Sequence, residues 1–303
     1  MGARREAQPI QDESGPDMRS LLFVPGDSPR KFEKARQTAA DALILDLEDA
    51  VVEDRKDEAR TLTRRMLDGE RGGQAIYVRV NAVDTDRTLG DLAATLPGRP
   101  DGVMLPKCES VRDVVKLSAW LDGLEAACGL AIGATRILAI ATETARALIH
   151  LDYAEAGPRL AGLMWGAEDL AASLGATSKA DEHGLHSPFR LARDLCLIAA
   201  KAAGVTAIDT VYTRIDDVAG LAREAEAARR DGFTAKAVIH PKHVDVVNEA
   251  FAPTAAEIAW ARQVVDAFAA NGAAGVVTID GRMIDKPHLK AAETILATAS
   301  ART

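Results

Sequence analysis

The chain has 303 residues, of which 48% are hydrophobic and 27% are charged, so it is long enough for one large globular domain or two ordinary ones. Acidic residues outnumber basic ones by 45 to 37, and no basic stripe interrupts the sequence, which argues against a nucleic-acid partner. No apolar run approaches the roughly 20 residues that cross a bilayer, and the three cysteines form no CxxC pair, so we expect no membrane partner and a reducing, cytoplasmic location.

Residues 1–18 contain arginine but no apolar segment, which predicts a disordered arm and not a secretory signal. From residue 19 onward a short apolar run, a turn and an amphipathic helical stretch alternate eight times. The runs are apolar at consecutive positions, as expected of parallel strands that are covered on both faces. The predicted strands are residues 19–26, 42–49, 75–81, 102–107, 136–142, 162–169, 206–213 and 235–241.

Helical segments lie between these runs, for example residues 29–40, 110–127 and 219–231. Eight alternating strands and helices predict an α/β chain that folds as one TIM-type (β/α)8 barrel over residues 19–253. A doubly wound sheet is the alternative, because periodicity alone does not show that a sheet closes.

A C-terminal extension follows the predicted barrel over residues 254–303. Residues 254–270 predict a helix, with Thr254 and Glu257 spaced as a capping box. A short strand at 276–280, a loop at 281–286 and a final helix at 287–298 are expected next. A closed barrel does not need these elements, so we expect a lid or a contact with a neighbouring subunit.

Polar residues gather at the carboxyl ends of the predicted strands, and in TIM-type barrels these ends form the rim that holds the active site. In chain order they are Asp46, Glu48 and Asp49 on the second strand, Arg79 on the third, Lys107 on the fourth, Glu143 after the fifth, Asp169 on the sixth and His240 on the eighth.

Glu143 and Asp169 are the strongest candidates for metal ligands. They are separated by one strand–helix unit, so they are expected on neighbouring strands. Two adjacent carboxylates repel each other unless a cation or a proton lies between them. Ligation by a few oxygen atoms suits Mg2+, which keeps several waters and shares its other positions with substrate. Either residue alone could instead lie at a helix N-terminus, but the pair predicts a Mg2+ site.

Arg79 lies in the sequence YVRVN at 77–81, where it is expected to point opposite to its two valine neighbours. An inward-pointing arginine at the rim needs an anion. That anion could be a protein carboxylate, with Asp46 or Glu48 as candidates, or the carboxylate of a substrate. The sequence does not decide between these alternatives.

Six motifs occur in order along the chain: RSLLFVPG at 19–26, LDLED at 45–49, VRVN at 78–81, LPK at 105–107, GAEDLAA at 166–172 and IHPK at 239–242. Together they resemble the citrate lyase beta subunit-like family of CoA-ester lyases, which includes malyl-CoA, citramalyl-CoA and β-methylmalyl-CoA lyases. The resemblance extends from about residue 19 to about residue 297.

The resemblance implies catalytic roles for several of these residues. Glu143 and Asp169 would hold Mg2+, while Arg79 would bind the carboxylate of the keto- or hydroxy-acid half and help to polarise it. Asp285, in GRMIDKP at 281–287, matches an acid/base aspartate. In relatives this tail reaches into a neighbouring subunit, so we expect a homo-oligomer, either a trimer or a hexamer.

Four further residues match positions that bind the CoA ester. Phe23 and Lys34 match contacts to the CoA portion, and Ile239 and His240 match a backbone stretch near the thioester. The implied substrate is therefore a CoA thioester combined with a small keto or hydroxy acid.

The implied reaction is Mg2+-dependent retro-Claisen cleavage of a short 3-hydroxyacyl-CoA, of the malyl-, citramalyl- or citryl-CoA type, into an α-keto acid and an acyl-CoA. Two alternatives remain open at this point. One is a thioesterase of the malyl-CoA type, and the other is a citrate lyase beta subunit that acts on a carrier-bound substrate.

Overall fold

The computed structural model describes residues 18–272 and 275–300, so most of the predicted N-terminal arm lies outside the described residues. Eight strands form a closed barrel, in the order β1-β10-β9-β6-β5-β4-β3-β2. They are β1 Ser20–Pro25, β2 Ala42–Asp46, β3 Ala75–Arg79, β4 Gly102–Leu105, β5 Arg136–Ile140, β6 Leu160–Met164, β9 Thr206–Asp209 and β10 Ala235–Val238. All eight pairings are parallel, and β1 pairs with β10 as well as with β2. This closure confirms the TIM-type (β/α)8 barrel and excludes the doubly wound alternative.

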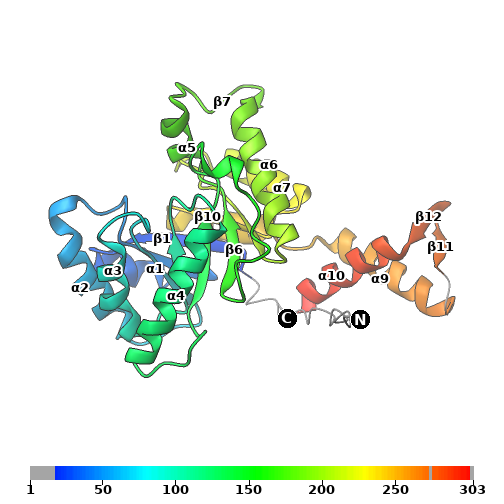
Figure 1. The fold of residues 1–303 in the computed structure, drawn as a ribbon. Helices are drawn as coiled ribbons and strands as arrows, with labels where there is room; N and C mark the ends of the chain where they lie inside the picture. The colour runs from blue at the N-terminus through cyan, green and yellow to red at the C-terminus, as the bar shows by residue number, and fades with distance from the viewer. Residues whose placement is uncertain (1–17, 273–274, 301–303) are drawn as a thin grey trace, which may run out of the picture.

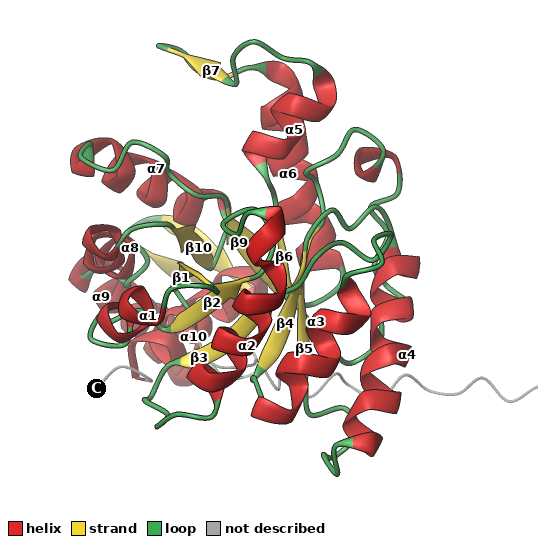
Figure 2. Cartoon of the chain, turned by 90° about the vertical axis from the view of Figure 1, so that its left-hand side faces the viewer, coloured by secondary structure: helices red, strands yellow, loops and turns green. Residues whose placement is uncertain are grey.

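Helices form a ring around the strands (Figure 2). They are α1 Pro29–Ala35, α2 Lys56–Leu67, α3 Thr88–Thr95, α4 Val111–Ala127, α5 Ala167–Leu174, α6 Ser187–Ala202, α7 Val218–Asp231 and α8 Val244–Ala250. A small hairpin of β7 Ala180–Asp181 and β8 Gly184–Leu185 lies between α5 and α6. No helix in residues 18–272 or 275–300 is both long and apolar enough to cross a membrane.

The strands carry apolar residues on both faces because each face packs against a different core. In β2, Leu43 and Leu45 belong to the cluster between the barrel and its helices, whereas Ala42 and Ile44 belong to the cluster inside the barrel. Burying one leucine side chain contributes about 2 kcal/mol. The runs of consecutive apolar residues in the sequence reflect this two-sided burial.

Each barrel strand ends earlier than the sequence predicted. The difference ranges from one residue in β1, which ends at Pro25, to five residues in β6, which ends at Met164. The segments that follow the strands are themselves largely buried along the rim, so their composition resembles that of a strand.

The extension consists of α9 Ala255–Ala270, β11 Val276–Ile279, β12 Arg282–Asp285 and α10 Lys286–Ser300. Thr254 caps α9 and forms the predicted capping box with Glu257. The extension has its own hydrophobic cluster, which includes Val264 and Phe268 of α9. In Figure 1 these elements project away from the barrel.

The prediction of a loop at 281–286 is wrong, because β12 pairs antiparallel with β11 in this region. Ile279 and Arg282 are paired, so only Asp280 and Gly281 form the turn. Both residues have positive φ angles, 49° and 74°, as in the two-residue turn that an Asp-Gly pair favours in hairpins. The Asp-Gly pair is a hairpin signal that the prediction did not use.

Candidate active site

Arg79 and Asp46 form an ion pair at the carboxyl ends of two neighbouring strands. They are the last residues of β3 and β2 and lie opposite each other in the register of that pair. Nε and Nη2 of Arg79 donate to the two carboxylate oxygens of Asp46, at 2.8 and 2.7 Å. This bidentate geometry fixes the plane of the guanidinium. Of the two alternatives for Arg79, the structure therefore contains the protein carboxylate.

The third nitrogen of Arg79 faces the rest of the rim. Nη1 lies 2.9 Å from Oε2 of Glu48 and 3.5 Å from Oδ2 of Asp49. The ring of Phe23 packs on the guanidinium, with 5.0 Å between Cζ and the ring centroid, a cation–π distance. Burial disfavours the charged form, but the three carboxylates outweigh it and raise the pKa of Arg79. The guanidinium therefore stays charged.

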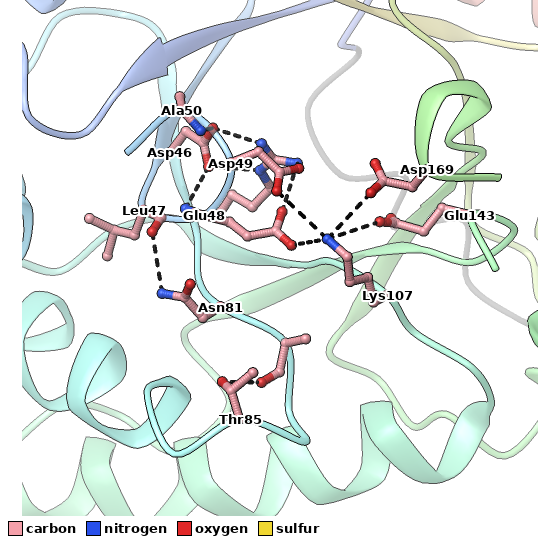
Figure 3. Close-up of polar contacts among 12 residues, drawn as sticks. Asp46, Leu47, Glu48, Asp49, Ala50, Asn81, Thr85, Lys107, Glu143 and Asp169 are labelled. Atoms are coloured by element: carbon pink, nitrogen blue, oxygen red, sulfur yellow. Dashed lines mark hydrogen bonds and ion pairs between the residues drawn. The ribbon is translucent and has the colours of Figure 1, made fainter. Parts of the chain in front are cut away.

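Lys107 lies at the centre of the remaining carboxylates (Figure 3). Its Nζ donates a hydrogen bond to Oε1 of Glu48. The same nitrogen lies 3.8 Å from Asp49, 3.9 Å from Glu143 and 3.5 Å from Asp169. The sequence placed Lys107 at the rim without giving it a role. An excess of acidic over basic residues at the strand ends was the signal that could have indicated one.

The backbone conformation of Lys107 is unusual. It lies two residues beyond the end of β4 and has a φ of 49°, a left-handed conformation that costs a residue with a side chain about 1 kcal/mol or more. Burial tends to lower the pKa of Lys107, but Glu48 and the other carboxylates raise it. The ammonium is therefore a permanent positive charge in this cluster.

Glu48 lies between Arg79 and Lys107, on a loop that accepts hydrogen bonds from the buried Lys56. Nζ of Lys56 donates to the carbonyl oxygens of Leu47 and Glu48 at 2.7 and 2.6 Å, and to Oδ1 of Asn81 at 3.0 Å. Burial raises the pKa of Glu48 to about 7, although Arg79 and Lys107 act against this shift. Sequence reasoning missed Lys56, because one lysine at the start of a charged helix carries no distinctive signal.

Glu143 is a buried carboxylate of the rim that lacks hydrogen bonds from the described residues. It follows β5, and only 1% of its surface is exposed. Among the residues that the structure describes, neither of its carboxylate oxygens accepts a hydrogen bond. Burial, together with the negative charges of Asp169 and Glu48, raises the pKa of Glu143 to about 8. A buried carboxylate that accepts no hydrogen bond is costly, so this group fits a bound cation.

Asp169 lies near the same Lys107 ammonium as Glu143 and comes from the next strand–helix unit. The prediction that it ends the sixth strand is wrong, because β6 ends at Met164 and Asp169 lies in the first turn of α5. The connection between them passes close to Glu143. A Cβ atom added to Gly166 would lie 2.6 Å from Cβ of Glu143, so glycine permits this close approach. β5 and β6 are neighbours, as predicted.

The two carboxylates fit a Mg2+ ion better than a metal that needs more protein ligands. No group of three or more His, Cys, Asp or Glu residues placed to hold a metal occurs in residues 18–272 and 275–300. Mg2+ is commonly held by one or two carboxylates, with water and substrate in its other positions. Glu143 and Asp169 are the residues that would hold it.

The residues matched to CoA binding lie on the β1 and β10 side of the barrel. Phe23 is in β1, which pairs with β10, and Lys34 is exposed in the last turn of α1. Ile239 and His240 follow β10, which ends at Val238, so the prediction that His240 ends this strand is wrong. Nδ1 of His240 accepts a hydrogen bond from the amide of Lys242 at 3.1 Å.

A single chain does not bring Asp285 to the rim. It is the last residue of β12, and in Figure 1 that strand lies in the extension, away from the barrel. Within the described ranges its ion pair is with His288 of the same extension.

A family model described as HpcH/HpaI aldolase/citrate lyase matches residues 19–241 of the chain. The chain is 36% identical over 286 residues to a (3S)-malyl-CoA thioesterase of Cereibacter sphaeroides (strain KD131), covering 93% of this chain and 95% of that protein. It is 35% identical over 294 residues to citrate lyase subunit beta of Escherichia coli K12, covering 96% of both.

Solved structures share the same architecture. Protein CitE from Mycobacterium tuberculosis, in complex with magnesium, acetoacetate and coenzyme A, superposes with a TM-score of 0.78 at 37% identity, covering 93% of this chain and 98% of that one. A citrate lyase beta subunit from the same organism, complexed with oxaloacetate and magnesium, gives a TM-score of 0.67 at 37% identity and covers 78% of this chain and 97% of that one.

Proposed function

The chain belongs to the HpcH/HpaI aldolase/citrate lyase family, and from this membership we propose that it is a Mg2+-dependent lyase that cleaves a short 3-hydroxyacyl-CoA of the malyl-, citramalyl- or citryl-CoA type. The products would be an α-keto acid and an acyl-CoA. Magnesium, coenzyme A and keto acids bound to related structures support this class of ligand.

The observation that carries the proposal is the buried carboxylate of Glu143. Its two oxygens accept no hydrogen bond in the part of the chain that the structure describes, and Asp169 repels it. The nearest cation, Nζ of Lys107, lies 3.9 Å from Glu143, so a metal ion that binds both carboxylates would stabilise the pair further. When bound between these residues, Mg2+ would act as a Lewis acid towards the oxygens of the hydroxy-acid half.

The other rim residues would bind and orient that half of the substrate. Nη1 of Arg79 faces Glu48 and Asp49, whereas its other two donors are held by Asp46. We propose that a substrate carboxylate competes with Glu48 for Nη1, while Asp46 keeps the guanidinium plane fixed. The acyl-CoA half would extend past Phe23, Lys34, Ile239 and His240.

Cleavage of the carbon–carbon bond leaves the acyl-CoA as an enolate, which must receive a proton. We propose that Asp285 of a neighbouring subunit performs this transfer, in a trimer or hexamer, and that its extension also excludes water from the site. The separate hydrophobic cluster of the extension supports its movement as a unit onto another copy. The cytoplasm is the proposed location.

Assaying the purified chain alone tests this function. Malyl-, methylmalyl-, citramalyl- and citryl-CoA would be supplied with Mg2+, and the products separated by chromatography. We expect a keto acid and an acyl-CoA in equal amounts. Free CoA together with the hydroxy acid would instead indicate a thioesterase, which the similarity to the malyl-CoA thioesterase makes the main alternative. No turnover without a carrier protein would indicate a citrate lyase beta subunit.

A further inference from the structure

His288 makes a close contact with the proposed acid/base residue of the extension. Its Nδ1 lies 2.5 Å from Oδ1 of Asp285. An ionised carboxylate can only accept hydrogen bonds, so Nδ1 must carry the hydrogen in this contact. The amide of Asp285 lies 3.4 Å from the same nitrogen, which is too long to compete with the shorter bond.

Two secondary-structure elements fix this pair in place. Asp285 is the last residue of β12 and is paired with Val276 of β11. His288 lies in the first turn of α10, which begins at Lys286. The side chains of Asp285 and His288 are 37% and 47% exposed, so they face outwards and not into the cluster of the extension. The pair is therefore accessible to a group that approaches the extension from outside.

The contact creates a chemical requirement. The hydrogen bond from His288 lowers the pKa of Asp285, so the carboxylate is ionised at neutral pH. An ionised carboxylate is ready to accept a proton but has none to donate. The proposed cleavage ends with donation of a proton to the enolate carbon, so Asp285 needs a proton source within reach.

We propose that His288 is this source: a positioning residue that orients Asp285 and supplies it with one proton in each turnover. The inference rests on the proposed function and identifies the partner of its acid/base group. The N–H bond of His288 breaks as an O–H bond forms on Asp285. That O–H bond then breaks as the enolate electron pair forms a C–H bond on the acyl-CoA.

The protons balance over the complete reaction. The N–H bond that breaks belongs to an imidazolium, which is left as the neutral imidazole and regains a proton from water at the same Nδ1, and the 3-hydroxyl group of the substrate loses one proton to water. No oxidant, reductant or further reactant is needed. In the condensation direction the same two residues would carry a proton from the acyl-CoA to water.

The competing explanation is a helix cap, because Asp285 also immediately precedes α10, and a cap would make the contact purely structural. His288→Asn separates the two roles. Its side-chain amide can donate to Oδ1 in the place of Nδ1, so the cap and the orientation of Asp285 are kept, but an amide does not pass on a proton. His288→Ala removes both the side-chain hydrogen bond and the proton supply, but it keeps the backbone amide that a cap uses.

The experiment uses the full-length chain with Mg2+ and measures three quantities. They are kcat and KM for CoA-ester cleavage, exchange of the α-hydrogens of acetyl-CoA with D2O by mass spectrometry, and the midpoint of thermal unfolding. We expect His288→Asn to keep KM and the unfolding midpoint but to lose about 100-fold in kcat and in exchange rate. His183→Asn, at a side chain that is 84% exposed in a barrel loop, is the matched control and should change none of them.

Near-wild-type kcat and exchange in His288→Asn would overturn the proton-supply role and leave a structural contact. His288→Ala provides the second comparison. If His288→Ala loses kcat while His288→Asn keeps the wild-type kcat, His288 is only a structural partner of Asp285. A wild-type chain that cleaves no ester of the panel overturns the proposed function itself, and the role of His288 falls with it.

Discussion

Nζ of Lys107 lies 3.5 Å from Oδ1 of Asp169, one of the two carboxylates proposed to hold Mg2+. The same ammonium is 3.9 Å from Glu143. The lysine therefore supplies a positive charge to the carboxylates that would bind the metal. A second cation entering this cluster must compete with it.

Replacing Lys107 by methionine should therefore raise the affinity for Mg2+ and lower the thermal stability of the metal-free protein. Removing one charge at this distance should raise the Mg2+ affinity about tenfold, and it leaves Glu48 without the hydrogen bond from Lys107. Titration calorimetry measures the first effect and thermal unfolding in EDTA the second. Lys116→Met is the control, because Lys116 contacts the carbonyl of Val83 and the ring of Trp120 instead. An unchanged affinity in Lys107→Met would contradict the competition.

Glu143→Gln should abolish both Mg2+ binding and activity without unfolding the protein. The side chain keeps its shape but loses the charge that burial and Asp169 disfavour, so unfolding in EDTA should occur at the same or a higher temperature. Asp169→Asn should also abolish activity, and EDTA should inactivate the wild type until Mg2+ is restored. Glu168→Gln is the control, because Glu168 precedes Asp169 but pairs with Lys179. Full activity in EDTA would refute the metal assignment.

Arg79→Lys keeps the charge but loses the bidentate pairing with Asp46. We expect KM for the hydroxy-acid half to rise at least tenfold, together with a loss of stability. Arg60→Lys is the matched control. Arg60 lies on helix α2 and also pairs with a buried aspartate, Asp91. The control substitution should lower the unfolding temperature and leave KM unchanged. If Arg79→Lys behaves in the same way, Arg79 is a structural partner of Asp46.

Asp285→Asn should lose most turnover while it still binds Mg2+ and CoA ester. Mixing it with Glu143→Ala subunits should restore part of the activity, because some sites then combine an intact metal pair with an intact extension. Native mass spectrometry would establish that mixed oligomers form. If they form and no activity returns, Asp285 does not complete the site of a neighbouring subunit.

The pair of Glu125 and Arg159 makes a prediction about pH and stability. Burial tends to raise the pKa of Glu125, but hydrogen bonds from Arg159 and from the amides of Thr135 and Gly133 hold it at about 2, against an ordinary value of 4.5. The pair therefore stabilises the fold above pH 4.5 and loses this contribution as the pH falls towards 2.

Glu125→Gln should lower the free energy of unfolding by about 3 kcal/mol at pH 7, and the difference from the wild type should shrink between pH 5 and pH 3. Denaturant unfolding at several pH values measures both. Asp122→Asn removes the exposed partner of the same arginine and should cost less than about 1 kcal/mol. A difference that does not depend on pH would contradict the ion pair as its cause.

The sequence predicted the eight strands because both faces of each strand are buried, as Leu43 and Ile44 show on β2. Closure was not predictable from periodicity, since it depends on the pairing of Ser20 with Lys236, on the first and last strands of the barrel in chain order. Asp169 was placed on a strand because the buried segment after Met164 has the composition of one. The role of Lys107 was missed because it depends on distances across the rim between residues from four strand ends.

Gly166 restricts which residues the family can accept beside Glu143. Any side chain there would collide with Glu143, so a relative with alanine or a larger residue at this place must move that carboxylate, even when both acidic residues remain in its sequence. With Glu143 as a metal ligand, as proposed, such a relative would align well and still lack the reaction. Among divergent homologues, this glycine is therefore a stricter marker of retained chemistry than the two carboxylates, although it has no functional group of its own.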